Sequence, residues 1–131
     1  MSWLRRRNNA ARTELEEVKR LLRGLRDSGA RKRAAVGTGV GVANSDFLIR
    51  FGTIDSFRGS AATQRERFYE RLADLELGLR NEAPDMALGI GLYRIWLDET
   101  LAGRREAAEL LGEELTELSR GASGAVVPAG K

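Results

Sequence analysis

The segment VGTGVGV, residues 36–42, places glycine at every second position, and closely spaced glycines can hold a phosphate group. A P-loop also needs a lysine and a hydroxyl residue after its last glycine, and a dinucleotide site needs a buried strand before the first; neither is present. Alternation with a period of two is typical of an extended strand, with bare glycine on one face. We therefore expect another backbone or an aromatic ring to pack closely on Gly37, Gly39 and Gly41.

Few residues are available for catalysis. The chain contains no histidine and no cysteine, which removes the commonest general base, the thiolate nucleophile and the usual transition-metal ligands. Adjacent acids such as Asp98 and Glu99 point about 100° apart on a helix, which is a poor geometry for a carboxylate pair. The sequence predicts a protein that is not an enzyme and needs no cofactor or metal.

Two basic clusters offer a different chemistry, the binding of phosphates. Residues 1–33 hold eleven Arg and Lys against four Asp and Glu, whereas the remaining residues are net acidic. No motif of a nucleic-acid-binding family accompanies the clusters, so solvent-exposed charge is the simpler interpretation. The candidate phosphate contacts are Arg5, Arg6, Arg7, Arg31, Lys32 and Arg33.

The elements that position these residues begin with a helix over about residues 3–27. Apolar or small residues recur there in steps of four and three, the pattern of heptad a and d positions. The seam consists of Leu4, Asn8, Ala11, Leu15, Val18, Leu22 and Leu25. The position after each d residue is basic, so two identical parallel helices match poorly and an acidic partner helix matches better. A helix of the chain's own bundle, an intermolecular coiled coil, and a helix on nucleic acid or a membrane surface all remain open.

Two further helices are predicted, over about residues 61–82 and 84–119. Pro84 ends the first and fits the first turn of the second, which favours an antiparallel hairpin. The second half of the last helix is rich in glutamate. It therefore offers the opposite charge for the basic positions of the first helix, within one chain or between chains.

Residues 36–54 allow two interpretations. Phe47, Ile49 and Phe51 share one face of a strand, whereas Phe47, Phe51 and Ile54 match helical spacing. We favour a glycine-rich β-hairpin or extended insertion. The predicted fold is mainly α: one helical domain over residues 1–120, with a basic coiled-coil-like helix at 1–28, a glycine-rich segment at 34–59 and a tail at 121–131.

These features favour a structural or adaptor subunit of a multi-copy assembly, for which a virion connector is one model. Its partners would be further copies of itself or other protein subunits. The expected interface comprises Leu4, Asn8, Leu15, Val18, Leu22, Leu25, Gly37, Gly39 and Gly41. The alternative is a nucleic-acid-associated protein that uses the basic first helix. The longest apolar stretch has about twelve residues and a spanning helix needs about 20, so we expect no transmembrane segment and a place in the cytoplasm or in a particle assembled there.

Overall fold

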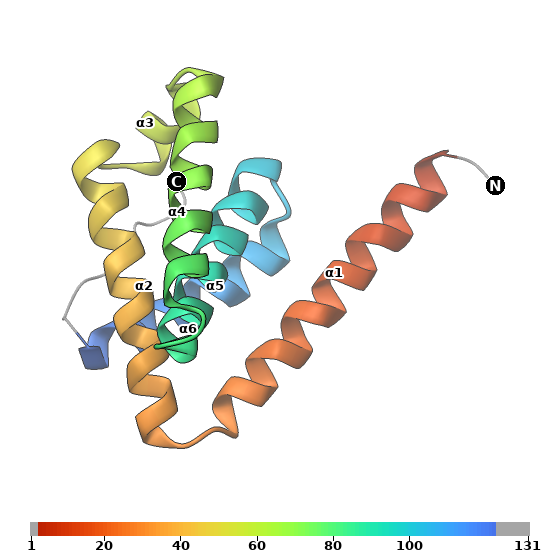
Figure 1. Ribbon diagram of the computed structural model, residues 1–131. Coiled ribbons are helices and arrows are strands. Elements are labelled where there is room, and N and C mark those ends of the chain that lie inside the picture. The colour runs from red at the N-terminus through yellow and green to blue at the C-terminus, as the bar shows by residue number, and fades with distance from the viewer. Residues whose placement is uncertain (1–2, 123–131) are drawn as a thin grey trace.

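The computed structural model describes the backbone of residues 3–122 and the side chains of residues 14–120 (Figure 1). Within this part the chain forms helices joined by short turns, and no strand is present. The helices are α1 (Trp3–Arg26), α2 (Ala30–Arg50), α3 (Ile54–Gly59), α4 (Ala62–Leu79), α5 (Pro84–Ala102) and α6 (Arg105–Ala122). The mainly helical prediction is confirmed. The rest of the predicted tail, residues 123–131, lies outside the described residues.

The predicted β-hairpin over residues 36–54 is wrong, because the glycine-rich segment lies inside α2. The order of valine, threonine and glycine in this segment fits both the two-residue repeat of a strand and the 3.6-residue repeat of a helix. Read in steps of four and three, Val36, Val40, Ala43 and Phe47 fall on one helical face, and all four are buried. α2 is the central helix and packs most extensively on α5 and α6, so tertiary contacts outweigh the low helix propensity of glycine.

Glycine permits a very close crossing of α2 and α5. A Cβ atom added to Gly39 would lie 2.0 Å from the carbonyl oxygen of Met86, and one added to Gly89 would lie 2.1 Å from the carbonyl oxygen of Val36. Each helix thus presents a glycine to the backbone of the other. Close approach of another backbone, which the sequence predicted for Gly39, is confirmed, although the element is a helix instead of a strand.

The predicted single helix over residues 84–119 is also wrong, because the chain turns back after α5. Gly103 has φ of 76°, a left-handed conformation that glycine adopts without a steric penalty. The amides of Gly103 and Arg104 donate to the carbonyls of Thr100 and Glu99, at 3.2 and 3.0 Å, and close the end of the helix. α6 then packs on both α5 and α2.

The hairpin of α4 and α5 agrees with the sequence. Pro84 occupies the first turn of α5. Arg94 on α5 donates to Glu76 on α4 at 3.0 Å, while Asp98, one turn later on α5, acts electrostatically on Tyr69, earlier on α4. The two helices therefore run antiparallel, as predicted.

Burial governs the ionisation of both tyrosines in the chain. The hydroxyl of Tyr93 donates to Oδ1 of Asn44 at 2.9 Å, and burial raises the pKa of Tyr93 far above its ordinary value. Burial, reinforced by the charge of Asp98, raises the pKa of Tyr69 to about 12. In both residues the folded state favours the protonated phenol.

Alkaline pH is therefore expected to destabilise the fold. In the unfolded chain both tyrosines lose their protons near pH ~10, whereas the folded state retains them, so the free energy of unfolding falls as pH rises above that value. Titration of tyrosinate absorbance should show a delayed transition in the native protein and an ordinary one in denaturant. A native tyrosine that ionises near pH ~10 while the helical circular dichroism is intact would contradict this account.

Candidate assembly interface

α1 is attached to the rest of the molecule through its C-terminal half. Val18, Leu22 and Leu25 are buried, Leu15 and Leu21 pack on the same core, and α6 is the helix that α1 contacts most. All of these residues of α1 except Leu21 belong to the later part of the predicted seam. The heptad pattern thus marks the buried face of α1 correctly from Leu15 onward.

The N-terminal half of α1 stands apart from the other helices. Figure 1 shows α1 leaving the body at an angle, with its first turns separated from every other described element. The seam continues along this half in the sequence, through Leu4, Asn8 and Ala11. The predicted residues whose side chains lie outside the described part are Leu4, Arg5, Arg6, Arg7 and Asn8. We call residues 3–13 the arm.

A buried carboxylate fastens the other end of α1. Only 6% of the Glu114 side chain on α6 is exposed, and it accepts hydrogen bonds from Arg26 of α1 at 3.3 Å and from Arg33 of α2 at 2.9 Å. Arg33 also donates to the carbonyl of Leu25 at 3.1 Å. The expectation that the acidic last helix would pair with a basic position of the first is confirmed for Arg26, within one chain.

A second ion cluster supports the turn between α5 and α6. Arg104 lies 2.5 Å from the buried carboxylate of Glu99 and 2.9 Å from Glu14 of α1. The hydrogen bond to Glu99 raises the pKa of the Arg104 guanidinium, and the charges of Glu99 and Glu14 act in the same direction. Both clusters are therefore sets of ion pairs within one chain that hold α1 against α5 and α6.

The remaining predicted site residues fall into two environments. Arg31 and Lys32 are exposed at the start of α2, whereas Arg33 forms an ion pair with Glu114. Among the glycines, Gly37, Gly39 and Gly41 are all buried on α2, in the core of the single chain. Of these residues, Arg31 and Lys32 are thus accessible to a partner, whereas the three glycines are not.

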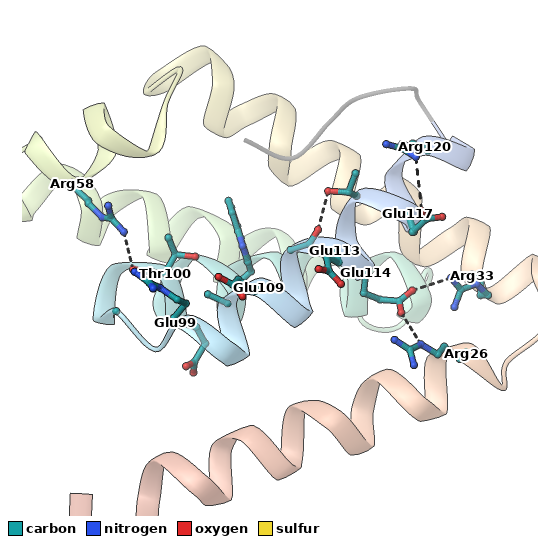
Figure 2. Close-up of a pocket in the computed structure, with 16 residues that line it drawn as sticks. Arg26, Arg33, Arg58, Glu99, Thr100, Glu109, Glu113, Glu114, Glu117 and Arg120 are labelled. Carbon is teal, nitrogen blue, oxygen red and sulfur yellow. Dashed lines mark hydrogen bonds and ion pairs between the residues drawn. The ribbon is translucent and has the colours of Figure 1, made fainter. Parts of the chain in front are cut away.

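A groove of about 1060 Å³ runs over α6 and the end of α5 (Figure 2). Arg58, whose guanidinium donates to the carbonyl of Thr100 at 3.2 Å, lies at one end, and Arg26 and Arg33 lie at the other. Its uncharged lining includes Trp96, Ala108, Gly112 and Thr116. We call this feature the α6 groove.

Exposed acids follow the α6 groove along one face of the helix. Glu109, Glu113 and Glu117 line it, and Glu106 continues the row by one turn. Of these, only Glu117 has an ion pair within the described side chains, at 3.8 Å to Arg120. The sequence reveals the glutamates but not the groove, because the groove exists only once α6 has turned back on α5.

Neither a metal site nor a membrane span is found in the described part of the chain. No group of three or more acidic side chains there is arranged to hold a metal ion. None of the described helices combines the length and the apolar character that crossing a bilayer requires. No protein-family model, curated protein or solved structure matches the chain.

Proposed function

We propose that this protein is a non-enzymatic structural or adaptor subunit of a multi-copy assembly, and that α1 is the helix through which the copies or their partners join. A virion connector is one kind of particle that such a subunit suits. The proposal rests on a single observation. The amphipathic pattern of α1 continues in the sequence of the arm, whose backbone is separated from every other described helix in Figure 1.

An uncovered amphipathic helix gains stability when a partner buries its apolar face. Complete burial of one leucine side chain contributes about 1.5–3 kcal/mol, and a helical segment of about 11 residues is marginal in water without tertiary contacts. Arm residues Leu4 and Ala11 occupy the same heptad position as Val18 and Leu25, which are buried in the body. The arm thus offers a partner the same face that the rest of α1 already uses for packing.

The charges of the arm indicate the character of that partner. Residues 3–13 contain four arginines and no acidic residue. Two arms packed side by side would bring like charges together, which is destabilising. An acidic surface, on a second copy or on another subunit, is the favourable counterpart.

Polar substitutions in the seam of the arm are expected to weaken the assembly. Replacing Leu4 and Ala11 with glutamine removes apolar contact while retaining helix propensity and charge, and the loss of one buried leucine alone corresponds to a tenfold or larger decrease in affinity. The matched control replaces Asn9 and Ala10, at outward heptad positions. Sedimentation velocity should show a lower mass for the seam variant only. Equal masses for the two variants would contradict the proposed role of α1.

The alternative proposal is binding of nucleic acid through the basic residues of α1 and of the start of α2. The exposure of Arg31 and Lys32 supports it, since neither forms an ion pair among the described side chains. Its distinguishing property is an affinity for oligonucleotides that falls steeply with added salt, because each neutralised phosphate releases counterions.

A further inference from the structure

We propose that the arm of one copy docks in the α6 groove of a second copy. This inference rests on the proposed function and names the surface that receives the arm. Charge, length and lining each support the pairing of these two features.

Opposite charges face each other in this arrangement. The arm carries Arg5, Arg6, Arg7 and Arg12 without an acid, and the groove carries Glu109 and Glu113, which are exposed and form no ion pair among the described side chains. The groove is also lined by arginines, of which Arg26 and Arg33 pair with Glu114, Arg120 pairs with Glu117, Arg58 donates to the carbonyl of Thr100, and Arg105 is exposed at the start of α6. The buried acids nearby, Glu99 and Glu114, already have arginine partners in their own chain. Glu109 and Glu113 are therefore the acids of the groove that have no arginine partner among the described side chains.

The two features also agree in length. At 1.5 Å per residue, residues 3–13 form about 16 Å of helix, and Glu106 and Glu117 are separated by about the same distance along α6. Arg5 and Arg12 are one heptad apart, as are Glu106 and Glu113. A helix laid along α6 can thus bring two arginines and two glutamates into register at once.

The lining of the groove suits the apolar seam of the arm. A Cβ atom at Gly112 would lie 3.1 Å from Nε1 of Trp96, so the indole of Trp96 already occupies the space beside this glycine. Ala108 lies one turn before Gly112 and also lines the groove. A small residue at a helix surface allows a second helix to approach closely, so Ala108 is the position at which the apolar seam of the arm can come nearest to α6.

The contact is intermolecular and joins two different surfaces. α1 is a continuous helix whose C-terminal half is fixed to the body, and its N-terminal end points away from α6 in Figure 1. The arm therefore reaches an α6 groove only on another copy. A contact of this kind closes into a dimer when it is reciprocal and otherwise propagates into rings or filaments, as a multi-copy assembly requires.

Charge reversal with rescue tests the pairing. The arm variant carries Arg5→Glu, Arg6→Glu, Arg7→Glu and Arg12→Glu, and the groove variant carries Glu109→Lys, Glu113→Lys and Glu117→Lys. Each variant alone should sediment as a 14.4 kDa monomer, because its arm and groove then have the same charge. The equimolar mixture should regain at least twice that mass, because each arm now meets a groove of opposite charge on the other variant.

Control variants make the test specific to these two surfaces. Arg67→Glu with Arg80→Glu, and Glu66→Lys with Glu70→Lys and Asp74→Lys, change exposed charges on or beside α4. Both sets should retain the mass of the wild type. The rescue in the mixture also shows that the two reversed variants are folded.

Three results would overturn the inference. If the wild type assembles but the mixture of reversed variants remains monomeric, or if the groove variant assembles alone, the α6 groove is not the docking site while the assembly function stands. If the wild type is monomeric, the docking inference and the proposed function both fail. Binding of an oligonucleotide by that monomer, lost in the arm variant, would then establish the alternative function.

Discussion

Replacing Gly39 with alanine is expected to lower the free energy of unfolding by about 3 kcal/mol, at the upper end of the usual cost of overpacking a core. The added Cβ atom would lie 2.0 Å from the carbonyl oxygen of Met86 and 2.8 Å from its carbonyl carbon. These are backbone atoms, so no side-chain rotation relieves the overlap. α2 and α5 must separate, and buried neighbours such as Val40 and Ile90 lose contact as they do.

Gly89→Ala should act in the same way, because its Cβ atom would lie 2.1 Å from the carbonyl oxygen of Val36. The two substitutions together should cost less than the sum of the single effects, since separating the helices for one glycine makes room for the other. Gly39→Val should be at least as damaging as Gly39→Ala.

Urea denaturation followed by circular dichroism measures these effects, and the chain contains matched controls. Apart from the backbone of their own helix and their neighbours in the chain, Gly24 on α1 and Gly78 on α4 have no atom within 4 Å of an added Cβ. Alanine at either position should stabilise the protein by about 0.5–1 kcal/mol through helix propensity alone. If Gly39→Ala is as stable as Gly78→Ala, the close crossing of α2 and α5 does not exist.

Replacing Glu114 with glutamine is expected to lower the free energy of unfolding by about 2 kcal/mol. Breaking a buried ion pair typically costs about 3–5 kcal/mol, but here 29% of the Arg33 side chain and 64% of the Arg26 side chain are exposed, so water offsets part of the loss. Because Glu114 itself is buried, added salt should change the effect little.

Glu117→Gln is the matched control for Glu114→Gln, since it makes the same chemical change one turn further along α6. Glu117 is exposed and pairs with Arg120 at 3.8 Å, so its loss should cost no more than about 0.5 kcal/mol. Equal denaturation midpoints for the two variants would show that Glu114 does not fasten α1 and α2 to α6.

The sequence was most informative where one periodic pattern dominated. The heptad seam from Leu15 to Leu25 and the position of Pro84 predicted α1, α4 and the start of α5 closely. Each of these features is local, because a seam or a proline acts through its own few turns. The pairing of Arg26 with acidic α6 followed from charge alone.

The glycine-rich segment was mispredicted because its alternation satisfies both a strand and a helix. The alternation of valine or threonine with Gly37, Gly39 and Gly41 favours the strand when the segment is read by itself. The close packing of α2 as a helix involves Gly89, which lies about 50 residues away in the sequence and whose added Cβ atom would meet backbone atoms of Val36 and Val40. No local pattern in α2 contains that information.

The sequence identified the charged residues of the candidate site but did not reveal the groove along α6. The glutamates of α6 and the arginines of the arm are evident in the sequence. The α6 groove, however, depends on Gly103 taking a left-handed conformation, which lets α6 return against α5 beside Trp96. Glycine permits such a turn without requiring it, so the sequence alone allowed one long helix.

The central claim, that α1 joins copies of this chain, is tested most directly by sedimentation velocity of the wild-type protein over a wide range of concentration at low and at high salt. We predict a mass of at least twice 14.4 kDa that falls toward the monomer on dilution and on addition of salt. A mass of 14.4 kDa at every concentration and at both salt levels would contradict the account.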